Sequence, residues 1–381
     1  MCGMQMFMVS GGYYVYELTG SASLLGLITA VAAVPAVTLS LFGGVIADRM
    51  EKKRIIQVGQ IVSGLISLGI GITIVTGSIT WVHFLVVSFI HGAVMPLIMP
   101  ARQAIIPQLV GPEKLMNAVA LNAMVLSLTT MIAPGVAGAL ISTMGIDKVY
   151  FVIATMSTMA VFFTGLIPRI ETPPKGPSGI LGDIKDGFSY VHSNQVILIL
   201  LILSFGTMMF AMPLRFILPI FAKDVFLVGP EGLGYLMSAM GVGALLGTLF
   251  IASLKNLSRR GLVLIVSGIL SGIILLGFSI MSHLIPVYFF ALAFMLLSGV
   301  IQAGRMALSS SLMMQYTVQE YRGRVMSLLT LTHGLMPAGV IPVTVMSDQL
   351  GAPIALGIMA TLLILLTSTI LVVSQRLRNL D

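Results

Sequence analysis

The sequence predicts an all-α membrane protein of twelve spans, arranged as two six-helix halves with pseudo-twofold symmetry. Three observations support this fold class. The composition is 57% hydrophobic and 9% charged, with a mean hydropathy of +1.06, whereas soluble domains carry roughly 25% charged residues. Long windows such as residues 55–82 and 150–167 contain no charged side chain. One polar segment near the middle divides the apolar runs into two equal sets.

Apolar runs between polar breaks give the expected helices in chain order. A helix needs about 20 apolar residues to cross a bilayer. Eleven runs are long enough, and they cover residues 24–46, 55–76, 82–105, 116–142, 149–167, 195–222, 232–254, 262–282, 285–312, 324–346 and 351–373. Residues 1–16 are also apolar but would extend only about 24 Å as a helix, less than a hydrocarbon core of about 30 Å. We therefore expect a truncated first span whose helix begins upstream of Met1.

A secretory signal peptide is the alternative for residues 1–16. Signal peptides begin with a basic segment and end at a cleavage site flanked by small residues. The first Lys or Arg of this chain is Arg49, and no clear cleavage site follows the apolar run. The sequence therefore favours the truncated span.

Basic residues set the expected orientation, because short cytoplasmic loops retain Lys and Arg. Sixteen of the 20 Lys and Arg residues fall on one side of the predicted spans, and only Lys148 and Lys223 fall on the other. This predicts an integral multi-pass protein of the cell membrane with both termini in the cytoplasm. The net charge of +7 is spread over separate cytoplasmic segments, which favours contact with anionic lipid headgroups over nucleic-acid binding.

The polar segment at residues 168–194 contains four Pro and four Gly, and we expect it to be a cytoplasmic linker. It separates an N-terminal half, residues 1–167, from a C-terminal half, residues 195–381. Within the linker, residues 180–191 have the apolar spacing of a short helix at the membrane surface.

Two equal halves suggest an internal duplication. A shift of 207 residues places Gly92 on Gly299 and Glu113 on Glu320. Together with the two sets of spans, this agreement indicates a transporter that binds its solute between two related halves near the middle of the membrane.

Charge is concentrated in the stretch GGVIADRMEKKRI, residues 43–55, which holds six charged residues within seven positions. This stretch resembles the signature of the major facilitator superfamily, G-x-x-x-D-R-x-G-R/K-R/K. The matching residues are Gly44, Asp48, Arg49, Lys52 and Lys53. The resemblance covers essentially the whole chain. YELTGSASLLGL and PARQAIIPQLVGPEKLMNAVALN are similar to the branch of siderophore exporters and macrolide-type efflux proteins.

The resemblance implies that these charges bridge cytoplasmic helix ends and latch the outward-open state. Glu51 stands where the family prefers Gly, so the charges of the signature match better than its tight turn. From the residues alone, Asp48 at a helix end can pair with nearby basic groups, and carbonyl groups at helix C-termini attract cations. The alternative is that the charges only anchor the topology.

Titratable groups within or beside the spans are candidates for proton coupling. No Asp or Glu lies well inside any predicted span, which leaves His91, His333 and Glu17. Free imidazole titrates near neutrality and suits proton exchange, although each residue would serve equally well as a structural polar group. Drug–proton antiporters of the superfamily carry R-x-x-Q-G in the fourth helix. Here Ser88 replaces its arginine and His91 its glutamine, so the resemblance implies a polar cavity group.

Candidates for substrate contact lie in spans that the resemblance makes cavity-lining. Arg215 and Arg305 are the two arginines within spans, and a guanidinium can hold an anionic group. Alternatively, Arg215 reaches lipid headgroups and Arg305 a buried acceptor. Asn122 adds a further polar contact.

The stretch TMIAPGVAGAL, residues 130–140, resembles the exporter motif G-P-x-x-G-G, with Pro134 and Gly138 retained and Ala in place of two glycines. Small residues permit close helix approach and proline permits a bend, although ordinary packing explains the stretch nearly as well. Through the resemblance, the motif favours export.

The expected function is secondary active efflux of hydrophobic or amphipathic molecules, such as drugs, macrolides or siderophore-like compounds, by alternating access and in exchange for protons. A monomer in contact with lipid is expected, without cofactor, metal or nucleic acid. The alternatives are a facilitator or importer of a small polar metabolite, and a non-transporting receptor. An enzyme is not expected, because the sequence has no Walker loop, nucleophile elbow or metal-ligand spacing. The lone Cys2 allows no internal disulfide.

Overall fold

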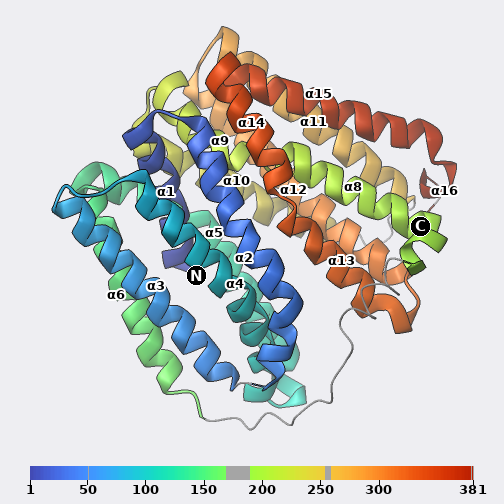
Figure 1. Cartoon of the computed structure of the whole chain (residues 1–381). Helices are drawn as coiled ribbons and strands as arrows, with labels where there is room; N and C mark the ends of the chain where they lie inside the picture. The colour runs from blue at the N-terminus through green and yellow to red at the C-terminus, as the bar shows by residue number, and fades with distance from the viewer. Residues whose placement is uncertain (50, 169–188, 254–258, 379, 381) are drawn as a thin grey trace. The chain divides into compact units, whose positions relative to one another are not determined.

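Helices account for the regular structure of the chain in the computed structural model, which describes residues 1–49, 51–168, 189–253, 259–378 and 380 (Figure 1). Internal contacts group the chain into two units. Unit 1 comprises Met1–Pro177 with Gly229–Tyr235, and unit 2 comprises Ser178–Val228 with Leu236–Asp381. Most of the expected linker, and most of the surface helix predicted at residues 180–191, lie outside the described residues, while residues 189–193 are helical.

Unit 1 contains six long helices in the expected order. They are α1 (Cys2–Thr19), α2 (Ala22–Arg49), α3 (Lys52–Val75), α4 (Trp81–Leu109), α5 (Leu115–Met144) and α6 (Ile146–Gly165), with the short helix η1 (Pro112–Lys114) before α5. Its most extensive pairings are α2 with α4 and α3 with α6, and α1 packs against α5 and α6. Two tight connections use glycine with positive φ, Gly20 at 64° and Gly145 at 95°, a conformation that costs glycine little.

Unit 2 contains most of the remaining helices. They are α8 (Gln195–Ala211), α9 (Leu214–Ile220), the single-turn π-helix η2 (Phe221–Val225), α10 (Gly229–Ser253), α11 (Arg260–Leu284), α12 (Tyr288–Tyr316), η3 (Gln319–Tyr321), α13 (Arg322–Gly334), α14 (Pro337–Leu350), α15 (Ala352–Val373) and α16 (Gln375–Arg378). The first seven residues of α10 group with unit 1.

Two expected spans are broken, and proline explains both breaks. The run predicted at 195–222 is interrupted between α8 and α9 at Pro213, because proline lacks an N–H and clashes with the preceding turn. The run predicted at 324–346 is interrupted before Pro337, which starts α14 in the position that proline favours in a helix.

The twelve-span fold class is confirmed. Among the described residues, ten helical stretches are long and apolar enough to cross a membrane, including Gln195–Val225 as one stretch. The less apolar α1 and the interrupted pair α13–α14 complete the expected order. The helix α1 runs to Thr19 rather than ending at residue 16 as expected.

Helix boundaries repeat at the spacing found in the sequence. Adding 207 to the bounds of α4, 81 and 109, gives 288 and 316, the bounds of α12. The same shift carries η1 onto η3 and the start of α5 onto the start of α13. These coincidences are what an internal duplication predicts.

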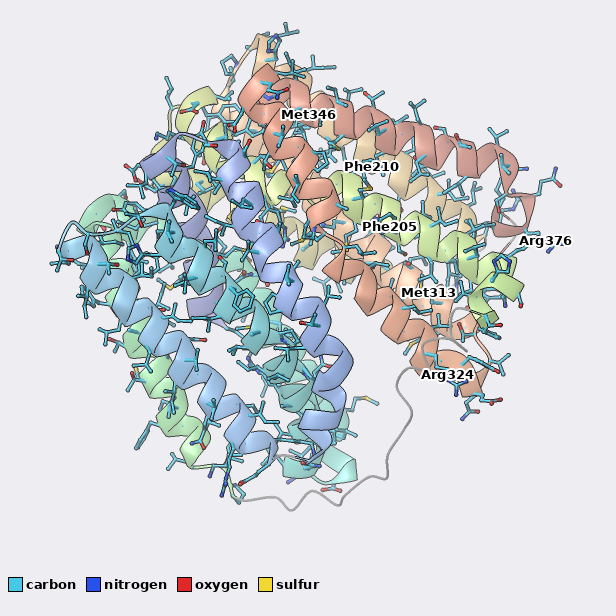
Figure 2. The ribbon with its side chains drawn as sticks, in the orientation of Figure 1. Phe205, Phe210, Met313, Arg324, Met346 and Arg376 are labelled. Atoms are coloured by element: carbon cyan, nitrogen blue, oxygen red, sulfur yellow. The ribbon has the colours of Figure 1, made fainter. Side chains whose placement is uncertain are left out.

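Side chains of unit 2 form an apolar core that includes Ile197, Leu312 and Met313 (Figure 2). Polar contacts lie beside it: Arg376 donates to the Gln195 side chain at 2.9 Å, and the Arg324 guanidinium lies 5.2 Å from the centre of the Tyr321 ring. Elsewhere large apolar side chains remain exposed, among them Leu65, Phe162 and Phe289. Such exposure is expected where lipid, and not water, is the solvent.

Candidate substrate and gating residues

The signature stretch lies at the junction of α2 and α3. Gly44, Asp48 and Arg49 belong to the last turns of α2, but their side chains lie outside the part of the structure that is described. Lys52 opens α3 and is buried. The latch between cytoplasmic helix ends therefore stays a prediction.

Lys53 has a defined partner at the end of α6. Its ammonium group donates to the backbone oxygens of Gly165, at 2.7 Å, and Ile167, at 2.5 Å. These carbonyl groups end the helix, where backbone acceptors lack intrahelical partners and the helix dipole favours cations. Lys53 thus ties the start of α3 to the end of α6. Neighbouring Arg54 instead pairs with Glu51 at 2.8 Å in an exposed salt bridge.

His91 belongs to an aromatic cluster inside unit 1. Its ring stacks parallel on Phe7 with centroids 5.4 Å apart, and Phe7 meets the edge of Tyr150 at 5.7 Å. The Tyr150 ring also lies 6.4 Å from Phe84, and its hydroxyl is buried without a hydrogen-bond partner among the described residues. The cluster joins α1, α4 and α6, and His91 is its titratable member.

The ring contacts described for this cluster include neither Glu17 nor His333. Glu17 is exposed near the C-terminal end of α1. His333 belongs to α13, but its side chain is not among those described. Asn122 is half-buried on α5. Their parts in transport stay predictions.

The predicted bend motif lies in the middle of α5, which continues through Pro134 from Leu115 to Met144. Ala133, Pro134, Ala137 and Gly138 are all buried. Within unit 1, a Cβ at Gly138 would lie 2.4 Å from the Pro230 carbonyl oxygen. The small residues are thus needed for close packing, while the link to export stays a prediction.

Unit 2 contains a half-open cavity of about 90 Å³ that has both polar and apolar walls. Its lining consists of Leu203, Ser204, Thr207, Met208, Met212, Leu264, Gln302, Arg305, Met306, Ser309, Ser310, Leu329 and Thr332. We call it the Arg305 cavity. Arg215 does not line it: this residue lies in the second position of α9, half-buried, and its Nε is buried without a partner among the described residues.

One face of α12 supplies most of the polar lining. The residues at 302, 305, 306, 309 and 310 follow the spacing i, i+3, i+4, i+7 and i+8, which places them on one side of a helix. The polar residues Ser204 and Thr207 come from α8. The breaks noted above lie beside the cavity, because Met212 immediately precedes Pro213, and Thr332 closely precedes Pro337.

Most polar groups of the Arg305 cavity have partners inside it. The Gln302 amide donates to Met212 Sδ at 3.1 Å, and the hydroxyls of Ser204 and Ser309 are 2.9 Å apart. Thr207 donates to the Ser204 carbonyl at 2.9 Å. Arg305 differs, since its side chain is only 8% exposed and its Nη1 has no hydrogen-bond partner among the described residues.

Sequence reasoning found Arg305 but missed the hydroxyl groups around it. The hydroxyls of Ser309 and Ser310 carried a signal that could have found them, because they follow Gln302 and Arg305 at helical spacing. Ser204 and Thr207 carried no such signal, because they sit in one of the most apolar helices of the chain and join the cavity only through packing.

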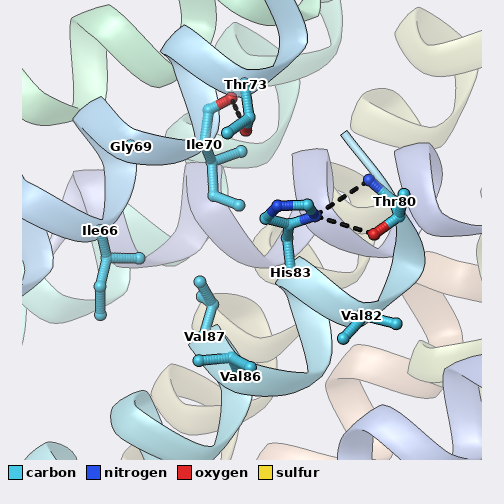
Figure 3. Close-up of a pocket in the computed structure, with 9 residues that line it drawn as sticks. All are labelled: Ile66, Gly69, Ile70, Thr73, Thr80, Val82, His83, Val86 and Val87. Carbon is cyan, nitrogen blue, oxygen red and sulfur yellow. Dashed lines mark hydrogen bonds between the residues drawn. The ribbon is translucent and has the colours of Figure 1, made fainter. Parts of the chain in front are cut away.

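A larger, mainly aliphatic cavity of about 430 Å³ lies between α3 and α4 in unit 1 (Figure 3). Its polar members are Thr73, Thr80 and His83. The Thr80 N–H donates to His83 Nδ1 at 3.1 Å, which caps the start of α4. Among these lining residues are none of the predicted substrate candidates. Chemically, these walls suit a hydrocarbon chain better than a polar solute.

The family comparison covers the whole chain. The model of a family described as "transmembrane secretion effector" matches residues 1–381. The chain is 25% identical over 313 residues to the enterobactin exporter EntS of Shigella boydii serotype 18, a match that covers 82% of this chain and 71% of that protein. The enterobactin exporter EntS of Escherichia coli O139:H28 gives the same identity and coverage.

Solved structures share the fold at low sequence identity. The D-xylose–proton symporter has a TM-score of 0.76 at 14% identity, with 100% of this chain and 96% of that chain covered. The nucleoside transporter NupG has a TM-score of 0.72 at 16% identity, with 97% and 95% covered. Both are transporters of the major facilitator superfamily. The chain therefore belongs to the transmembrane secretion effector family of the major facilitator superfamily and is an integral multi-pass membrane transporter.

Proposed function

We propose that this chain exports amphipathic small molecules from the cytoplasm by alternating access, in exchange for protons. It acts as a monomer with both termini in the cytoplasm. The observation that carries the proposal is the Arg305 cavity, in which thioether and aliphatic surfaces face hydroxyl, amide and guanidinium groups.

The cavity chemistry supports an amphipathic ligand. Met208, Met212 and Met306 offer flexible, polarisable surfaces that adapt to apolar groups of varied shape. The polar lining groups require polar atoms on the ligand, because a ligand without them would leave these groups without hydrogen-bond partners. A purely polar solute such as a sugar would in turn leave the methionine surfaces without apolar contact.

The direction of transport rests on the relatives. The family description names secretion, and the curated relatives named above are exporters of enterobactin. The solved structures inform the fold alone at their low identity and favour no substrate. Export of a siderophore-like or drug-like compound follows as the proposed activity.

Control of alternating access is assigned to the signature stretch. In this proposal Gly44 belongs to the signature in the last turns of α2, while Asp48 and Arg49 pair across cytoplasmic helix ends. Lys52 and Lys53 complete the charged cluster, and Lys53 braces α3 against α6 through its two carbonyl contacts. In this proposal the Lys53 contacts hold the start of α3 against α6 when the pairing of Asp48 and Arg49 breaks.

The test is efflux from cells that produce the protein. We expect cells loaded with a fluorescent amphipath or a catecholate siderophore to lose it faster than cells with the empty vector, and an uncoupler to abolish the difference. The Arg54→Gln variant serves as a control. It changes an exposed charge outside the cavity, and we expect it to export as fast as the wild type. Retention of every tested amphipath, together with uptake of a sugar or nucleoside, would favour the facilitator or importer instead.

A further inference from the structure

We infer that the Arg305 cavity is a binding subsite for an anion, and that the transported amphipaths carry an ionised acidic group which Arg305 holds. This inference rests on the proposed function and adds the charge of the substrate to it. The acidic group is a carboxylate or a deprotonated phenol at one end of the molecule, with the apolar body outside the subsite.

A buried guanidinium nitrogen without a hydrogen-bond partner is energetically costly in a membrane protein. Arg305 is 8% exposed, and its Nη1 lacks a partner among the described residues. Arginine stays protonated in proteins, so the cation persists in the cavity. Removing a charge from water without a partner costs several kcal/mol. Because Arg305 lines the cavity, a ligand there is in a position to supply a partner for Nη1.

The walls of the cavity supply no counter-charge. Its lining residues include no Asp or Glu. The polar groups beside Arg305 on α12, Gln302 and Ser309, are neutral and already engaged with Met212 and Ser204. An occupant that pairs with Nη1 must therefore bring the negative charge itself.

A second donor is available close to the cation. The mutual hydrogen bond of Ser204 and Ser309 uses one hydroxyl proton, and the other hydroxyl proton is free to reach a ligand. An anionic oxygen accepts from both a guanidinium and a hydroxyl, and charge-assisted hydrogen bonds of this kind are shorter and stronger than neutral ones. A neutral ester would gain less from the same donors.

The volume limits what enters the subsite. A water molecule needs about 10–15 Å³ of such space, so a cavity of about 90 Å³ holds several waters or one carboxylate with its nearest carbons. In this inference the acidic end occupies the cavity, and its methionines contact the adjoining apolar carbons.

The experiment compares one fluorescent amphipathic carboxylic acid with its methyl ester, which differ by one charge at neutral pH. Transport is measured in everted membrane vesicles for the wild type and for Arg305→Gln, Arg305→Lys and Arg215→Gln. We expect Arg305→Gln to lower transport of the acid about tenfold to a hundredfold and to change transport of the ester less than twofold.

The other variants separate charge from geometry. Arg305→Lys keeps the charge but not the planar fork of donors, so intermediate transport of the acid is expected. Arg215→Gln removes a half-buried arginine that does not line the cavity, and it should preserve the preference for the acid. Equal losses of acid and ester in Arg305→Gln would indicate a structural role and overturn the inference.

Binding to the wild type gives a readout that needs no variant. We expect the acid to raise the thermal unfolding temperature of the purified protein more than the ester does at equal concentration. Equal stabilisation by both compounds, or efflux of the ester as fast as the acid, would overturn the anion subsite while leaving export intact. Transport of neither compound nor of any other amphipath by the wild type would refute the proposed function.

Discussion

Single charges have different roles in this chain according to what surrounds them. Lys53 contacts two carbonyl oxygens at a helix end, Arg54 contacts a carboxylate in solvent, and Arg305 lies in a cavity with its Nη1 lacking a partner among the described residues. The sequence shows three basic residues and predicts only that each is costly within a bilayer. The partners of Lys53 and Arg54 come from the end of α6 and from Glu51, and the cavity around Arg305 forms only in the folded chain.

Lys53→Met should destabilise unit 1, because the side chain then leaves the carbonyls of Gly165 and Ile167 without their cation. Hydrogen bonds to a charged group contribute about 1.5–3 kcal/mol each when well shielded, and partial exposure lowers this figure. We expect a total loss of about 1–2 kcal/mol, seen as a lower unfolding temperature in detergent micelles.

Arg54→Met is the matched control for Lys53→Met. Arg54 is 65% exposed, and its pairing with Glu51 joins neighbours in sequence. The unfolding temperature of Arg54→Met should therefore stay near that of the wild type. Equal unfolding temperatures of Lys53→Met and the wild type would show that the contact at the end of α6 does not contribute to stability. The charge would then act only in the latch or in topology.

Whole helices were the most predictable feature of the fold. The twelve apolar runs became helices in the expected order, and ten of them are long and apolar enough to cross a membrane among the described residues, because lipid requires every backbone group of a span to be bonded within it. The breaks at Pro213 and Pro337 were not predicted, since proline in a membrane helix is tolerated and the kink depends on neighbouring helices. Those breaks border the Arg305 cavity, so the site was less predictable than the helices around it.

Close contact between α2 and α4 depends on Gly92. A Cβ at this position would lie 2.0 Å from the Ala32 carbonyl oxygen, which is backbone and cannot rotate away. We expect Gly92→Ala to force the two helices apart and to reduce the yield and unfolding temperature of folded protein. The symmetry-related Gly299→Ala should behave similarly, because its Cβ would lie 2.1 Å from the Met240 carbonyl oxygen.

Gly69→Ala provides the opposite case on α3. Nothing lies within 4 Å of a Cβ built at Gly69, and alanine is favoured over glycine in a helix by roughly 0.5–1 kcal/mol. Its unfolding temperature should equal or exceed that of the wild type. If Gly92→Ala melts no lower than Gly69→Ala, the close approach of α2 and α4 does not govern stability.

At the scale of the whole molecule, the electrical work of transport follows from the charges that cross the membrane. One charge moved through 100 mV is worth about 2.3 kcal/mol, which corresponds to about a fortyfold concentration ratio. Exchange of one entering proton for one neutral substrate moves one charge. Exchange for a departing monoanion moves two charges in the same sense, so the attainable ratio is roughly the square of that value.

We predict that proton coupling depends on His91. Its imidazole is half-buried and stacked on Phe7 at 5.4 Å, in a cluster with the buried Tyr150 hydroxyl, and no predicted span carries an acid well inside it. In vesicles with a clamped potential and an imposed pH gradient, His91→Gln should keep downhill substrate exchange but lose acceleration by the pH gradient.

His83→Gln on the same helix is the control. His83 caps the start of α4 through Thr80, so its substitution should lower stability slightly and leave the response to the pH gradient unchanged. Equivalent substitutions at Glu17 and His333 test the remaining candidates. If His91→Gln responds to the pH gradient as the wild type does while one of these loses the response, the proton passes through that residue instead. If the wild type itself ignores both the pH gradient and the potential, transport is uncoupled and the chain is a facilitator.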